Sequence, residues 1–340
     1  QVVFERTAQD LYAVLSLPPG NYTAYAENHN PVPASGNFYI LYLPAPLGIA
    51  DYGINPTEGN IEPYVEKFYS VLGIANIYNY SVPVQYNSSS SLQLNTVLQV
   101  NSLYGSEQLW LQDVVHLVGK GKTVTISFVD NIWNFTAPYA NVSQVLMEGS
   151  GGVYVYKAQT YYGVVTPNFT SSLPLELILV INVSTVPNGV LVRFGYINSS
   201  NYELVWYDNV TVKVPGIESA YLLVDGYNAT GSGNAYDTEL VFGGMCCGEQ
   251  TYFAKMNATL QLVYYNGTYF LPKAVLPFGL DTAEGVYDLE TVSGNGAFDV
   301  TTGNNIVLPL VLTQPLSLTV TNYTRVVDEG QNVTVTFSIS

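Results

Sequence analysis

The stretch LWLQDVVHLVGKGKTVTISFVDN, residues 109–131, decides the fold because it contains two alternating runs joined by a glycine-rich turn. Apolar residues occupy alternate positions in the first run, and Asp113 falls among them. Asp130 continues the apolar phase of the second run. Alternate residues of a strand share a face, and Gly-Lys-Gly-Lys between two such runs indicates a hairpin. The sequence therefore predicts a β-hairpin with two carboxyl groups on its core face.

The length of the turn sets the register of this hairpin. A two-residue or four-residue loop places Asp113 opposite Phe128 and Leu111 opposite Asp130. The two aspartates are then diagonal neighbours, about 7–8 Å apart at the backbone. A three-residue loop would put them on opposite faces. Because a buried, unpaired carboxylate is costly, the pair is a candidate acid dyad; its structural alternative is a strand-end aspartate that hydrogen-bonds a turn or Asn131.

Other acids compete with this pair. In the run 204–214, Asp208 shares the phase of the apolar residues and is a third inward carboxylate. In the run 236–242, Asp237 and Glu239 share the face opposite the apolar one, which predicts either a solvated face or a second acid pair. Asp281 and Glu284 have the spacing of a capping box, which predicts a helix N-terminus there.

The charge balance restricts the partners and the habitat. Only 11% of the residues are charged, with 26 Asp and Glu against 10 Lys and Arg, so the net charge is −16 at pH 7. A negative field disfavours nucleic acid and anionic membranes as partners. No apolar run approaches the roughly 20 residues of a membrane span. A chain with so few charges loses little electrostatic stabilisation when acid neutralises its carboxylates, and this fits an acid environment.

Glycosylation sequons are dense. Chance pairing predicts roughly five at this composition, and the excess indicates N-linked glycans outside the cell; a composition rich in β-turn residues is the alternative. The chain starts at Gln1 with no signal peptide, so we expect a mature or trimmed secreted form. The sequon asparagines are Asn21, Asn79, Asn87, Asn134, Asn141, Asn168, Asn182, Asn198, Asn209, Asn228, Asn257, Asn266, Asn322 and Asn332.

The two cysteines, Cys246 and Cys247, are adjacent, and ordinary disulfides need a larger separation of the α-carbons. Reduced thiols in a Gly-rich loop are the simplest expectation, and a vicinal or interchain bridge is the alternative. This pair cannot form a metal site with His29 and His116. We therefore expect no metal and no cofactor.

The whole chain is predicted to be all-β, a large antiparallel β-sandwich-type domain with few short helices. One such helix is expected at 61–77, and two prolines argue against a central strand at 38–52. The expected units are an N-terminal strand segment (1–36), a main β domain (37–312) and a tail (313–340) that reads as the first strands of an Ig-like domain. Such a tail could pair with another chain by strand addition.

Several motifs in order resemble the thermopsin family, the secreted acid peptidases of thermoacidophilic archaea, from about Tyr39 to Glu290. The family implies a β-rich, glycosylated, extracellular protein that works in strong acid without metal or cofactor. Two features depart from the family pattern: the Gly-rich run is here GGMCCG (243–248), and the segments before Tyr39 and after about Leu312 have no family counterpart. The motifs are PAPLGIADYG (44–53), LQLNTVLQVN (92–101), WLQDV (110–114), FVDNIWNFT (128–136), WYDNVTV (206–212), VDGYNATGSGNAYDTELVFGG (224–244) and FGLDTAEGVYDL (278–289).

The resemblance gives no catalytic assignment, so the choice rests on chemistry. In strong acid imidazole is protonated, and a pair of carboxyl groups that shares one proton is the workable device. The predicted function is a secreted acid endopeptidase acting on polypeptides; the alternative is a glycosylated filament, sheath or S-layer component that self-associates through its terminal strands. Asp51, Asp281 and Glu284 also lie in the family-like motifs. The candidate catalytic acids are Asp113, Asp130, Asp208, Asp237 and Glu239.

Overall fold

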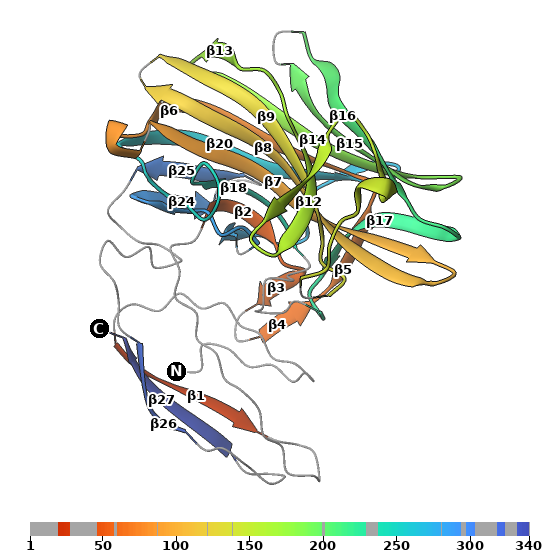
Figure 1. Cartoon of the computed structure of the whole chain (residues 1–340). Coiled ribbons are helices and arrows are strands. Elements are labelled where there is room, and N and C mark those ends of the chain that lie inside the picture. The colour runs from red at the N-terminus through yellow and green to blue at the C-terminus, as the bar shows by residue number, and fades with distance from the viewer. Residues whose placement is uncertain are drawn as a thin grey trace.

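The computed structural model describes residues 20–27, 46–57, 60–86, 88–120, 122–137, 139–198, 201–228, 237–279, 281–293, 297–302, 318–323 and 332–339. These residues form strands, with helical structure limited to two short 3₁₀ turns, Val84–Tyr86 and Gln144–Leu146. The all-β class is therefore confirmed (Figure 1). No helix in the described part of the chain is long and apolar enough to cross a membrane.

Most strands belong to two layers, which we call the first and the second sheet. The layers join through one bridge, between Ser81 and Lys120. The first sheet runs in the order β22 (Leu276–Phe278), β2 (Leu47–Asp51), β18 (Thr238–Gly243), β7 (Ser89–Ser102), β8 (Gly105–Lys120), β9 (Thr123–Asn134), β12 (Gln159–Val165) and β11 (Gly152–Tyr156). The second runs in the order β24 (Leu289–Ser293), β25 (Phe298–Thr302), β20 (Lys255–Tyr265), β6 (Ser70–Ser81), β14 (Leu175–Val186), β15 (Gly189–Asn198), β16 (Glu203–Lys213) and β10 (Met147–Glu148).

Shorter strands extend these layers. β17 (Ile217–Asp225) pairs with β7 next to β18 and carries β5 (Val65–Phe68), while β13 (Phe169–Ser172) pairs with β9 and β21 (Tyr269–Phe270) with β20. β3 (Ile54–Thr57) and β4 (Asn60–Pro63) form a hairpin. β19 (Gln250–Tyr252) and β23 (Gly285–Tyr287) pair in parallel. Every other described pairing is antiparallel, as expected for a β-sandwich.

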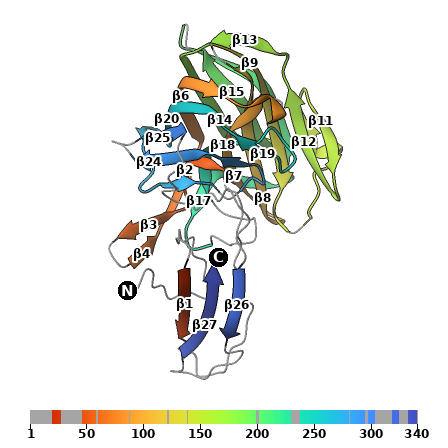
Figure 2. The same ribbon diagram turned by 90° about the vertical axis from the view of Figure 1, so that its left-hand side faces the viewer.

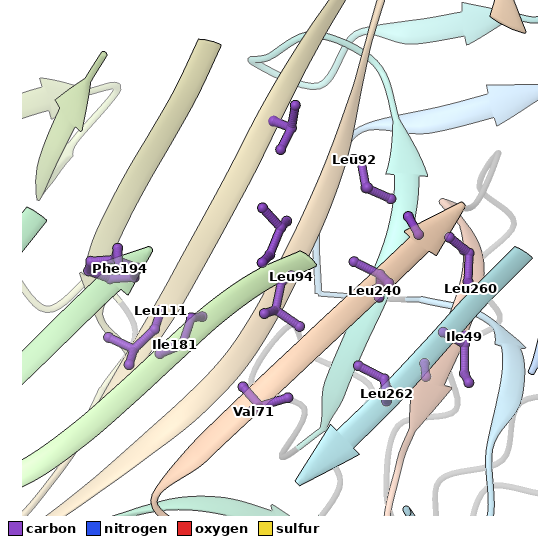
Figure 3. Packing of buried hydrophobic residues seen from close by; sticks show 14 of the residues in the cluster. Ile49, Val71, Leu92, Leu94, Leu111, Ile181, Phe194, Leu240, Leu260 and Leu262 are labelled. Atoms are coloured by element: carbon purple, nitrogen blue, oxygen red, sulfur yellow. The ribbon is translucent and has the colours of Figure 1, made fainter. Parts of the chain in front are cut away.

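The hydrophobic core lies between the two sheets. Leu94, Leu111 and Leu240 of the first sheet face Ile181 and Phe194 of the second across this core (Figure 3). Each of these side chains is fully buried. Because neighbouring positions along β7, β8 and β18 point to the opposite side, the first sheet presents a second, outer face. Both faces of this sheet prove to carry acids.

The helix predicted over 61–77 is wrong, because β5 and β6 occupy residues 65–68 and 70–77 of this range. Burial in β6 alternates, with Val71, Ala75 and Ile77 directed into the core. Gly73 shares that inward phase and lies against the side chains of Leu94 and Leu240. Because this inward position holds a glycine, the apolar alternation of the strand is interrupted in the sequence. The apolar residues that remain happen to have helical spacing, and this spacing led to the wrong prediction.

Two further expectations are corrected. β2 is a central strand, paired with β18 and β22, because it begins directly after Pro46 and so avoids the prolines. The helix expected at Asp281 is absent: residues 281–284 form a bend that leads into β23. Glu284 instead accepts hydrogen bonds from Thr282 Oγ1 and, at 2.9 Å, from Gly248 N.

The two ends of the chain form a separate three-stranded sheet (Figure 2). β27 (Asn332–Ile339) pairs along one edge with β1 (Gly20–Glu27) and along the other with β26 (Leu318–Tyr323). The two tail strands are confirmed. Of the N-terminal strand segment predicted over 1–36, the structure describes residues 20–27, and the three-domain division and the Ig-like character of the tail stay predictions.

Candidate active site

The β8–β9 hairpin brings Asp113 and Asp130 closer than predicted. The ladder closes with Lys120 opposite Thr123, so Asp113 lies directly opposite Asp130, and Phe128 lies opposite Val115. The predicted phase is confirmed, and the predicted register is wrong by two residues because the ladder continues as far as Lys120 and Thr123. Directly opposite residues have Cβ atoms about 4.5–5.5 Å apart.

Asp113, Asp130 and Asp208 lie between the two sheets, and we call them the interior acid cluster. All three are buried. Asp208 comes from β16 and accepts hydrogen bonds from Ser150 Oγ at 2.7 Å and from Tyr162 Oη at 2.8 Å. Asp113 Oδ1 accepts one from Tyr207 Oη at 2.8 Å.

A β-bulge explains how Tyr207 reaches this cluster. The pairing of β15 with β16 slips between Phe194 and Gly195, so that Tyr207 and Asp208 both turn inward. The Tyr207 ring stacks on Phe128 at 5.5 Å between centroids. A bulge places two successive residues against one partner, and it ends the continuous phase predicted for the run 204–214: Leu204 is exposed.

The interior acids favour their neutral forms. Burial, together with the charges of Asp208 and Asp113, raises the pKa of Asp130 to about 9. Neither Asp130 oxygen has a hydrogen-bond partner among the described residues. Burial also raises the pKa of Asp113 well above its usual range, although Tyr207 opposes the shift. A protonated Asp130 avoids the cost of a buried charge.

A polar row crosses the outer face of the same sheet. Glu239 lies opposite Asn95, Asn95 opposite Gln112, and Gln112 opposite Asn131. Asn95 Nδ2 donates to Glu239 Oε1 at 2.7 Å, and Gln112 Nε2 donates to Asn95 Oδ1 at 3.2 Å. Glu239 is fully buried, so the solvated face expected for it is wrong. Gly279 covers it so closely that a Cβ there would collide with the carboxylate.

Asp237 and Asp281 meet beside Glu239, and we call these three residues the outer-face acid cluster. The carboxyl groups of Asp237 and Asp281 are buried, each shifts the pKa of the other, and none of their four oxygens has a hydrogen-bond partner among the described residues. Two neighbouring carboxyl groups can bond each other once one of them holds a proton. Asp281 lies after β22 in a part of the chain that sequence analysis assigned to a helix cap. The sequence feature that could have identified Asp281 as a site residue is an acidic residue within an apolar segment, followed by no helical periodicity.

The two pKa values in this pair are pushed apart. Burial raises the pKa of both Asp237 and Asp281 well above the usual range for aspartate. The charge of Asp281 raises the pKa of Asp237 further. Asp237 and the nearby Trp110 indole lower the pKa of Asp281, against the charge of Glu239. The pair therefore loses its protons one at a time, and the first loss leaves one proton for two carboxyl groups.

Asp51, another acid of the family-like motifs, has a structural position. Its oxygens accept bonds from Tyr64 Oη at 2.5 Å, Gly53 N at 2.8 Å and Tyr264 Oη at 2.9 Å. Burial raises its pKa to about 6, and these three donors oppose the shift. With three hydrogen-bond donors around its carboxyl group, Asp51 fixes the end of β2 in place.

No group of His, Cys, Asp and Glu suited to holding a metal ion occurs in the part of the chain that the structure describes. Cys246 and Cys247 are free and exposed. Of the fourteen sequon asparagines, ten have described side chains, and none of these is buried.

Comparisons with known proteins place the chain in a family. The thermopsin family model matches residues 33–289. Thermopsin of Sulfolobus acidocaldarius is 39% identical over 277 residues, which cover 76% of this chain and 81% of that protein. A solved structure, Scytalido-glutamic peptidase with a peptide-based transition state analog, is 9% identical with a TM-score of 0.32, covering 77% of this chain and 100% of its own. The match over most of the chain confirms the resemblance, and the chain belongs to the thermopsin family of peptidases.

Proposed function

We propose that this protein is an extracellular acid endopeptidase whose catalytic carboxyl pair is Asp237 and Asp281. The observation that carries the proposal is that these two buried carboxyl groups lie close enough to shift each other's pKa, while none of their four oxygens has a hydrogen-bond partner among the described residues. Two acids so placed can hold one proton between them, which is the arrangement that lets one group act as a base while the other acts as an acid.

Catalysis needs one ionised and one protonated member of the pair. The ionised carboxyl group accepts a proton from the attacking water. The other keeps its proton and donates it to the carbonyl oxygen or the leaving amine of the scissile peptide. Glu239, held by Asn95 at 2.7 Å, contributes a third carboxyl group beside the pair.

The interior acid cluster is the second candidate, because Asp113 and Asp130 were predicted as the dyad and stand directly opposite each other. Its location favours a structural role. Both side chains point between the two sheets, where a polypeptide substrate has no access without separating the core. Asp130 with a pKa of about 9 is neutral throughout the acid range and is a poor base there.

Secretion and acid operation fit the chemistry of the chain. Every sequon asparagine with a described side chain is at least partly exposed, as an attached glycan requires. Buried acids with raised pKa values favour the fold at low pH. A strand-addition polymer draws less support, because β27 is already paired along both edges within this chain.

The test compares isosteric variants at the two clusters. Asp237→Asn and Asp281→Asn should each lower kcat/KM for a peptide substrate in acid by about 10²–10⁴-fold with an unchanged melting temperature. Asp113→Asn and Asp130→Asn are the matched controls and should keep most of the activity. Full activity of both outer-face variants, together with inactive but folded interior variants, would transfer the catalytic role to the interior pair.

A further inference from the structure

Aromatic rings form a line across the outer face of the first sheet, starting beside the acid pair. In the ladder, Trp110 lies opposite Trp133, Trp133 opposite Tyr161, and Tyr161 opposite Tyr154. These four residues are the ring row. Trp133 and Tyr161 stack with centroids 4.4 Å apart, and Tyr154 and Tyr161 lie 5.8 Å apart. The row begins at Trp110, whose indole lies against Asp281.

Exposure increases along this line. Trp110 is buried under Phe135, at 5.3 Å between ring centroids. Trp133 and Tyr161 are half-buried, and Tyr154 is 53% exposed. Rings that belonged only to the hydrophobic core would all be buried to a similar extent. The exposure of the ring row instead increases from the acid pair to the edge of the sheet, and such a surface is suited to binding an extended polypeptide.

We propose that the ring row is an extended substrate-binding platform, which holds about seven residues of polypeptide on one side of the scissile bond. Rings facing such a chain favour aromatic or large apolar side chains at alternate positions. The site is a specificity determinant far from the reacting bond, and it rests on the proposed function of Asp237 and Asp281.

The length follows from the geometry of the sheet. Five strand spacings, from β18 through β7, β8, β9 and β12 to β11, separate Asp237 from Tyr154. At about 4.8 Å each this is about 24 Å, which an extended chain crosses in about seven residues. Short peptides would therefore contact the acid pair without reaching Tyr154.

The edge of the platform is tied to the loop that carries the two cysteines. Tyr156, at the end of β11, donates from its hydroxyl to the Cys247 carbonyl at 3.3 Å, and its ring meets Trp133 edge-on at 6.3 Å. The Gly248 amide in turn is held by Glu284 at 2.9 Å, three residues beyond Asp281. The β11–β12 hairpin at the sheet edge (Figure 2) is thus linked to the segment that supplies the catalytic acid.

The experiment measures binding of non-cleavable peptides, with a reduced amide in place of the scissile bond, by calorimetry in acid. One ten-residue peptide carries tyrosines at alternate distal positions, a second carries serines there, and a third has four residues only. Tyr154→Ser and Trp133→Phe should weaken binding of the long tyrosine peptide about three- to tenfold. Neither should affect the four-residue peptide.

Tyr104→Ser is the matched control, since Tyr104 is 83% exposed in the turn between β7 and β8. Equal affinity of the wild-type protein for the tyrosine and serine peptides, or unchanged affinity in both ring-row variants, would overturn the platform. So would an equal loss in the Tyr104 control. Because binding needs no catalysis, this result is independent of whether Asp237→Asn and Asp281→Asn abolish hydrolysis.

Discussion

The two faces of one sheet hold carboxyl groups in opposite circumstances. On the inner face, Asp113 and Asp130 are opposite each other; Tyr207 bonds Asp113, and Asp130 has no described hydrogen-bond partner. On the outer face, Asp237 and Asp281 come from separate segments, and each shifts the pKa of the other. Register alone produced the first pair, whereas tertiary folding produced the second.

If the proposed function holds, an inward carboxylate is a weak indicator of catalysis. The interior acids are surrounded by core side chains of both sheets. The outer-face acids lie next to a ring row that leads to an exposed edge. The proposed function gives the two clusters different roles, and three further measurements test that difference.

The largest expected effect is a failure of additivity at the outer-face pair. If Asp237 and Asp281 act as one proton-sharing unit, the double variant Asp237→Asn/Asp281→Asn should lose the same 10²–10⁴-fold in kcat/KM as the more damaging single variant. The measurement is the kinetics of all three variants at one acid pH. Losses that multiply would mean that the two groups act separately.

The next effect concerns the pH dependence of folding. The pKa of Asp130 is raised to about 9 in the folded state from 3.8, so the native protein binds more protons than the unfolded chain between these values. Its stabilising contribution is complete below about pH 4 and is lost as pH rises toward 9. Asp130→Asn should remove up to about 1.4 kcal/mol per pH unit from the slope.

Denaturant unfolding at several pH values between 4 and 8 measures this slope. Asp299→Asn is a suitable control because Asp299 is an exposed carboxyl on β25. A wild-type slope that Asp130→Asn leaves intact would show that the interior cluster does not hold its protons as proposed.

The sequence predicted the fold class and the phase of these strands because alternation is a local property. Asp113 and Asp130 could be placed on the core face from the residues beside them alone. The register that pairs them could not be predicted, because a Gly-Lys-Gly-Lys turn is compatible with more than one loop length. Gly73, which packs where a side chain was expected, concealed a strand. Asp281 was out of reach because its partner Asp237 lies far away in sequence and only the fold brings them together.

The smallest expected effect is at the hydroxyl of Tyr207. Tyr207→Phe removes the bond to Asp113 Oδ1 and should destabilise the protein by about 0.5–1.5 kcal/mol without changing kcat/KM. Tyr196→Phe is the matched control, because Tyr196 stacks on the same Phe128 ring at 4.2 Å. Denaturant unfolding and peptide hydrolysis are measured on both variants. A large loss of activity in Tyr207→Phe with normal stability would contradict a purely structural role for the interior acid cluster, because Tyr207 contacts that cluster through Asp113.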